Sequence, residues 1–122
     1  MKNDSIIQGT WTPISAELGG QPFPERILTA MKLILTENSY TAIISNVTDK
    51  GMLTLHASDQ QNAMDILGTE GPNKGKTIPA IFELTEETLK VCYDLEGKRR
   101  PHDFHTEPHT QLFLVSYRRD KT

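Results

Sequence analysis

Three of the four histidines in this 122-residue chain fall within one short segment, residues 101–109. The possible metal-binding side chains of the segment are His102, Asp103, His105, Glu107 and His109. Neutral imidazoles and carboxylates are ligands that Zn²⁺ and Ni²⁺ accept. The histidine spacings would suit one face of a helix, but Pro101 and Pro108 favour an irregular loop. We therefore expect an exposed polar loop, with a surface metal site at His102, His105 and His109 as the alternative.

A second chemical pattern is the glycine- and lysine-rich stretch from Gly71 to Thr77, which resembles a phosphate-binding loop. A P-loop has four residues between its glycines, whereas Gly71 and Gly75 enclose three. A β-type segment follows, where a P-loop requires a helix whose N-terminus holds the phosphate. The stretch thus predicts a tight turn between two strands and not a nucleotide site.

The remaining histidine, His56, lies in a β-type segment on the same alternate face as Met52. If that face points inward, His56 is a candidate polar group in a pocket, with Tyr40 or Tyr93 beside it. A single histidine in this position is also typical of a hydrogen-bonded structural residue. Leu53 competes for the core from the opposite face, so the pattern leaves the inward face open.

Nucleophilic catalysis has no sequence signature here. Serine, histidine and aspartate are present, but no Gly-x-Ser-x-Gly turn occurs in the chain. Cys92 is the single cysteine, which excludes an internal disulfide, and it lies in the middle of a β-type segment. We expect it to pack as a small hydrophobe. The sequence therefore predicts a protein that is not an enzyme and that has no cofactor.

The overall charge argues against two classes of partner. The formal net charge is −3, and the basic clusters at 98–100 and 118–121 have no interleaved aromatic residues. We therefore expect no nucleic-acid binding. No apolar run approaches the ~20 residues that span a bilayer, so we expect no membrane insertion. The first five residues show no apolar signal-peptide region, which makes a cytoplasmic location the expectation.

Short β-type segments dominate the chain and fit a single domain over residues 1–122. They are expected at 6–18, 31–35, 40–47, 52–57, 63–68, 77–84, 88–95 and 111–118. Expected turns or loops include 49–51, 58–62 and 71–75, and one short helix or turn is expected within 22–30. Eight strands with short connections allow either an antiparallel sandwich or a closed barrel.

Two of these strands show clear alternation of apolar residues on one face. The expected inward residues are Ile78, Ala80, Phe82, Leu84, Leu89, Val91, Tyr93 and Leu95. The ends of the chain favour the barrel over the sandwich. Gly9-Thr10-Trp11 near the first strand has the Gly-x-Trp pattern of lipocalins, and Arg118 and Arg119 end the last strand. In lipocalins such an arginine lies over the indole where the barrel closes, an interaction worth on the order of 1–2 kcal/mol.

Longer stretches carry the same resemblance. They are Glu70–Thr77, Ile81–Leu84, Thr88–Asp94, Arg100-Pro101 and Tyr117–Arg119. In this order they resemble a family of uncharacterised bacterial lipocalin-like domains, over about residues 7–119. The resemblance implies an all-β, eight-stranded antiparallel lipocalin-like barrel. It implies no catalytic residues.

A barrel of this size has room inside for side chains or for one small ligand. The candidate pocket residues are Ile43, His56, Phe82, Leu84, Leu89, Val91 and Tyr93. Such a wall would favour a hydrophobic or aromatic small molecule. The alternative is a module that binds another protein, as an inhibitor or accessory factor, through the barrel rim or its outer face. An open cavity of several hundred Å³ would favour the first function, and a filled barrel with an exposed apolar patch the second.

Overall fold

The computed structural model describes residues 6–56 and 61–120. The polar start of the chain, most of the loop expected at 58–62 and the far end of the second basic cluster lie outside these residues. No helix in the described part of the chain is long and apolar enough to cross a membrane.

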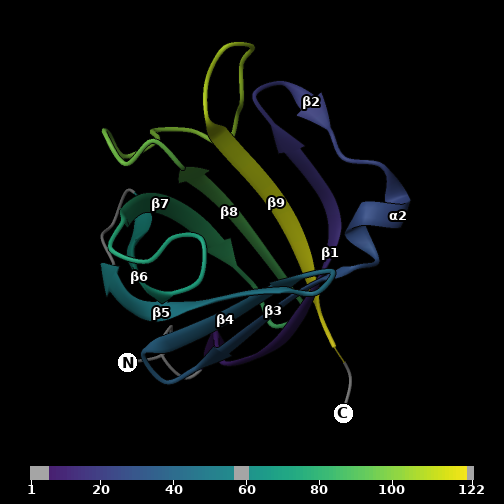
Figure 1. The fold of residues 1–122 in the computed structure, drawn as a ribbon, viewed down its shortest axis with the longest axis vertical. Helices are drawn as coiled ribbons and strands as arrows, with labels where there is room; N and C mark the ends of the chain where they lie inside the picture. The colour runs from purple at the N-terminus through teal and green to yellow at the C-terminus, as the bar shows by residue number, and fades with distance from the viewer. Residues whose placement is uncertain (1–5, 57–60, 121–122) are drawn as a thin grey trace.

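Eight antiparallel strands form one closed barrel (Figure 1). They are β1 (Gly9–Leu18), β3 (Met31–Thr36), β4 (Ser39–Ile44), β5 (Val47–His56), β6 (Asn62–Glu70), β7 (Thr77–Leu84), β8 (Thr88–Asp94) and β9 (Leu112–Arg119). Each strand pairs with the next along the chain, and β9 returns to pair with β1. The structure confirms the expected all-β barrel and excludes the sandwich.

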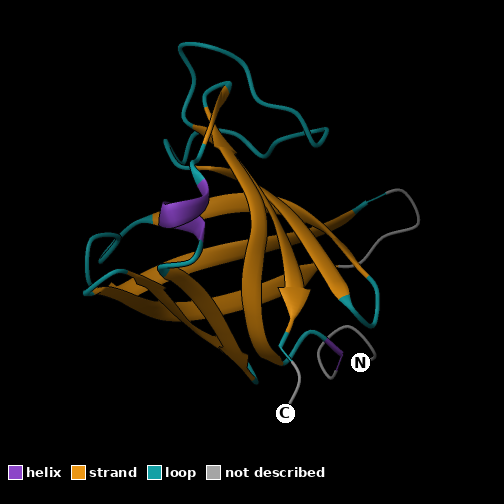
Figure 2. Ribbon diagram, turned by 90° about the vertical axis from the view of Figure 1, so that its right-hand side faces the viewer, coloured by secondary structure: helices purple, strands orange, loops and turns teal. Residues whose placement is uncertain are grey.

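One short helix follows the first strand, as expected. After β2 (Gln21–Pro22), the helix α2 (Glu25–Leu28) begins at the residue after Pro24. Pro24 has an extended backbone, so the helix does not include it. Strand β1 pairs with β3 only at its start, over Gly9–Trp11, and then runs along β9. The helix lies beside β1 and buries Leu28 in the core (Figures 1 and 2).

The turn expected at 49–51 is wrong. Strand β5 runs unbroken through these residues, and the hairpin from β4 turns instead at Ser45 and Asn46. Ser45 has a φ of 56°, the left-handed conformation that a two-residue hairpin needs. Gly51 lies inside the strand, and a Cβ there would come within 2.0 Å of the Leu67 carbonyl oxygen and 2.6 Å of the Tyr40 ring. The glycine is therefore a packing requirement and not a turn signal.

The turn expected at 71–75 is confirmed. Gly71 and Gly75 both have positive φ, 93° and 83°, and connect β6 to β7. Strand β7 follows directly, so no helix N-terminus faces this loop.

A tryptophan closes one end of the barrel. The Trp11 side chain is fully buried, and its indole N–H donates to the Ile7 carbonyl at 2.9 Å. The Arg119 guanidinium carbon lies 4.2 Å from the indole ring centroid. Arg119 also donates to the carbonyls of Ile6, Gln8 and Glu86. Arg119 therefore joins the first strand to the last at the closed end. Arg118, the other arginine of the predicted pair, is exposed.

The glycine of the Gly-x-Trp pattern has a steric reason. Gly9 has a φ of 137°, and a Cβ there would lie 2.9 Å from Nη1 of Arg119. Any side chain would displace the guanidinium from the indole face. The pattern Gly-x-Trp with a distant arginine is thus one packing unit.

The long connection between β8 and β9 packs on the outside of the barrel. It follows Asp94, the last residue of β8, whose carboxylate accepts hydrogen bonds from the backbone N–H groups of Glu96, Lys98 and Arg99. Cys92, on the outer face of β8, is fully buried, and its thiol faces the His105 carbonyl at 3.9 Å. Burial raises the pKa of this thiol. The cysteine is an inert packing residue, as expected from the sequence.

Candidate functional site

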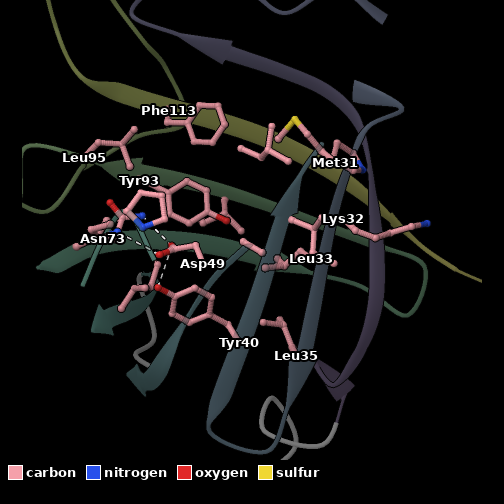
Figure 3. A pocket seen from close by; sticks show the side chains of 18 of the residues that line it. Met31, Lys32, Leu33, Leu35, Tyr40, Asp49, Asn73, Tyr93, Leu95 and Phe113 are labelled. Carbon is pink, nitrogen blue, oxygen red and sulfur yellow. Dashed lines mark hydrogen bonds between the residues drawn. The ribbon is translucent and has the colours of Figure 1, made fainter. Parts of the chain in front are cut away.

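The barrel encloses a cavity of about 360 Å³. This volume falls within the range of about 300–1,000 Å³ that small-molecule pockets occupy. Figure 3 shows the side chains that line it, which come from strands all around the barrel and from the loop after β6.

Most of the wall is apolar. Its deeper part is formed by Leu33, Leu35, Leu53, Met64, Ile66, Ile78, Leu89 and Val91, and all of these side chains are buried. At the end opposite Trp11 the cavity reaches Met31, Ile44, Val47, Leu95, Gln111 and Phe113. Ile44 and Val47 form the tip of the β4–β5 hairpin and are 44% and 48% exposed. The cavity therefore runs from a dry interior to an apolar rim.

A buried carboxylate lies in this apolar wall. Asp49 is 9% exposed and borders the cavity from β5. Its Oδ2 accepts from the Tyr40 hydroxyl at 3.1 Å and from Nδ2 of Asn73 at 2.8 Å, and its Oδ1 accepts from the Asn73 backbone N–H at 3.1 Å (Figure 3). Burial, and then the charge of Asp49, raise the pKa of Tyr40 well above its usual range. The tyrosine therefore stays protonated and donates.

A pair of tyrosine hydroxyls forms the second polar feature of the cavity. The hydroxyl oxygens of Tyr93 and Tyr117 lie 2.8 Å apart. Burial raises the pKa of Tyr93 to about 12 and that of Tyr117 well above its usual value. Both hydroxyls are neutral near pH 7. Because one mutual hydrogen bond uses one of the two protons, the other proton remains for an acceptor.

The charged side chains near the cavity are few. Lys32 borders the cavity, and Figure 3 shows its ammonium group turned away from the other side chains drawn. This group donates to Asp120 at 2.7 Å and to Thr12. Lys76 borders the cavity from the β6–β7 loop and is exposed.

The structure brings together four of the seven predicted pocket residues. Ile43, Leu89, Val91 and Tyr93 border the cavity. Phe82 is buried in the core but does not border the cavity. Leu84, the last residue of β7, is half-buried and does not border the cavity either. These two side chains fill the barrel toward its closed end instead of lining a ligand space.

His56, a candidate pocket residue on condition that its face of the strand points inward, does not border the cavity. Leu53 and Leu55 take the inward face of β5, and His56 lies outside with half of its side chain exposed. Its Nε2 lies 2.8 Å from Asp65, which also accepts from Arg100 at 2.7 Å. Burial opposes ionisation of Asp65, but the hydrogen bonds from these two partners outweigh it and lower its pKa. His56 is therefore a surface residue in hydrogen-bond contact with Asp65.

The histidine loop does not assemble a metal site in the described residues. No three side chains of His, Cys, Asp or Glu in residues 6–56 and 61–120 converge on one point. His102 and His105 are 88% and 64% exposed and lie near Asp103 and Glu107, their own neighbours in the loop. His109 has a φ of 67°, which directs the loop back toward β9. The structure thus agrees with the expected exposed polar loop.

The most distinctive polar group of the cavity was missed by the sequence analysis. Asp49 was assigned to a turn because Asp-Lys-Gly is typical of one. Its position nevertheless has the same alternation as Leu53 and Leu55, which places it on the apolar face of a strand that begins at Val47. An aspartate on an apolar face was the available signal.

Comparisons with known proteins support the barrel fold but suggest no ligand or reaction. A DUF4847 family protein from Bacteroides vulgatus has a similar structure, with a TM-score of 0.58 and 13% sequence identity. The similarity covers 100% of this chain and 99% of that one. No family model matches the sequence, and no curated protein matches it. The chain therefore shares its barrel fold with a bacterial protein of an uncharacterised family.

Proposed function

We propose that this protein is a lipocalin-like binding module whose cavity holds one small molecule with a hydrophobic or aromatic body. The observation that carries the proposal is the cavity of about 360 Å³ with its apolar wall. A barrel filled by its own side chains would leave no such space. Two polar features, Asp49 with its donors and the Tyr93–Tyr117 pair, would orient the bound molecule.

The proposal assigns no reaction to the cavity. Its tyrosines have raised pKa values and cannot serve as bases near neutral pH. His56, the histidine considered as a pocket group, lies on the outer surface. Binding and release of a molecule need only the wall, the rim and the polar groups described above.

A fluorescence titration with the neutral apolar dye N-phenyl-1-naphthylamine tests this function. We expect the dye to enter the cavity, with a blue-shifted, saturable emission at one dye per chain, because its rings would leave water for an apolar wall. Emission that stays at the level of free dye across the titration would contradict the proposal.

A second candidate is binding to another protein through the outer surface. Met52 and Leu67 face each other across β5 and β6, and they are 47% and 45% exposed. Such a pair adds apolar area to the outside of the barrel. It is smaller than the cavity wall, and we therefore rank this function second.

A further inference from the structure

The charges around the cavity are unbalanced. Asp49 is buried and forms no ion pair within the described part of the chain, and the three groups that donate to it, from Tyr40 and Asn73, are neutral. The ammonium group of Lys32 forms an ion pair with Asp120 outside the cavity. Lys76 is exposed at the border of the cavity. The apolar interior therefore holds a carboxylate without a cation.

The hydrogen bonds to Asp49 suit its ionised form. An ionised carboxylate only accepts, and it has about four acceptor positions on its two oxygens. Three of these positions take the Tyr40 hydroxyl and the two N–H groups of Asn73. One position on Oδ1 remains for a further donor. A donor that also carries positive charge would gain the most there, because its charge is opposite and the surroundings are apolar.

Aromatic rings line the same cavity and continue toward its rim. Tyr93 and Phe113 lie with ring centroids 5.6 Å apart, and Phe113 lies 5.5 Å from Phe23 of the segment before α2. Tyrosine and phenylalanine faces attract cations, as in the aromatic cages that bind ammonium groups. Such rings equally accept the aromatic or aliphatic body of a bound molecule.

We propose that the molecule held in this cavity is an amine, with a hydrophobic or aromatic body and one protonated amino group directed to Asp49. This inference rests on the proposed binding function and narrows it to one charge class. It excludes fatty acids and other carboxylates as the preferred occupant, because their charge would meet that of Asp49 in an apolar space. The body of the amine packs against the part of the cavity wall between Leu89 and Phe113.

A structural role for Asp49 is the competing interpretation. Its bonds to Asn73 also hold the β6–β7 loop against β5, where a Cβ on Gly68 would lie 2.1 Å from the Asn73 carbonyl oxygen. A purely structural carboxylate would affect folding but would leave the cavity indifferent to the charge of its occupant. The two roles therefore predict different binding preferences.

The test is displacement of N-phenyl-1-naphthylamine from the wild-type protein by three molecules of matched size. They are 3-phenylpropylamine, 3-phenylpropan-1-ol and 3-phenylpropionate, which differ in the charge at one end. We expect the amine to bind about tenfold or more tightly than the alcohol, and the acid to bind most weakly. An amine no better than the alcohol, or an acid that binds best, would overturn the inference while dye binding upholds the cavity function. If the dye itself does not bind, the proposed function fails and this inference fails with it.

Two variants separate the charge of Asp49 from its role in the loop. Asp49→Asn keeps the shape and removes the charge, and we expect it to abolish the preference for the amine over the alcohol. Asn73→Ala removes one donor from the loop and keeps the charge, so it should retain the preference. Loss of the preference in Asn73→Ala but not in Asp49→Asn would contradict the assignment. The comparison of the three molecules on the wild-type protein stands whether or not either variant folds.

Discussion

Replacing Trp11 with alanine is expected to lower the free energy of unfolding by about 3–5 kcal/mol. The indole is fully buried and fills the closed end of the barrel, where its N–H is bonded to the Ile7 carbonyl. Alanine would leave a cavity and would also remove the ring beneath the Arg119 guanidinium. Chemical denaturation followed by circular dichroism measures the change, because the variant loses the tryptophan signal itself.

A matched control lies on the same strand. Ile14 is 48% exposed on β1, and Ile14→Ala should change the free energy of unfolding by no more than about 0.5 kcal/mol. A loss below about 1 kcal/mol for Trp11→Ala would show that the indole does not close the barrel. The closure by Trp11 and Arg119 would then have to be abandoned.

Ala42→Trp is expected to weaken binding of the naphthylamine dye by about 10- to 100-fold. Ala42 borders the cavity from β4, where it pairs with Leu33 on one side and Asp49 on the other. An indole at this position would occupy the space that the dye needs. The fold should survive, because the added side chain enters an open cavity and not a filled core.

The neighbouring residue supplies the control for this variant. Thr41 precedes Ala42 on the same strand, and strand alternation places its side chain on the outer face. Thr41→Trp adds the same side chain outside the barrel and should leave dye affinity within about twofold, since it removes no cavity space. Equal affinities for the two tryptophan variants would mean that the dye binds somewhere other than the cavity.

The strands of the barrel could be predicted from the sequence because their signals are local. Turn residues divide the chain into strands, and Gly71 and Gly75 show this most clearly. The closure required a longer-range argument, from Gly9 and Trp11 at one end of the chain to an arginine at the other. The structure identifies that residue as Arg119 and explains the glycine by its contact with the guanidinium.

The site was only partly predictable because local signals conflict with tertiary packing there. Gly51 follows Asp49 and Lys50, a typical turn sequence, yet it is a strand glycine that makes room for the backbone of β6 and for the Tyr40 ring. Assigning that turn removed Asp49 from the strand and left His56 as the candidate polar group. Only the pairing of β4 with β5 shows that Asp49 and Tyr40 face the same interior.

The loop after β8 shows a second limit of local signals. Strand alternation places the Cys92 side chain on the outer face of the barrel, where the strand alone would leave it half exposed. It is fully buried because the loop that begins at Asp94 folds back over it. Composition predicted an irregular polar loop, but it contained no information on where that loop would lie.

The most direct test of the binding function is to analyse what the protein carries when it is purified from the organism that makes it. Wild-type protein and Ala42→Trp are purified in parallel, extracted with organic solvent, and compared by liquid chromatography and mass spectrometry. We expect a small molecule that is present with the wild type and depleted in the variant, and we expect this molecule to be an amine. Identical extracts from the two proteins, with no molecule enriched in the wild type, would contradict the claim that the cavity binds a ligand.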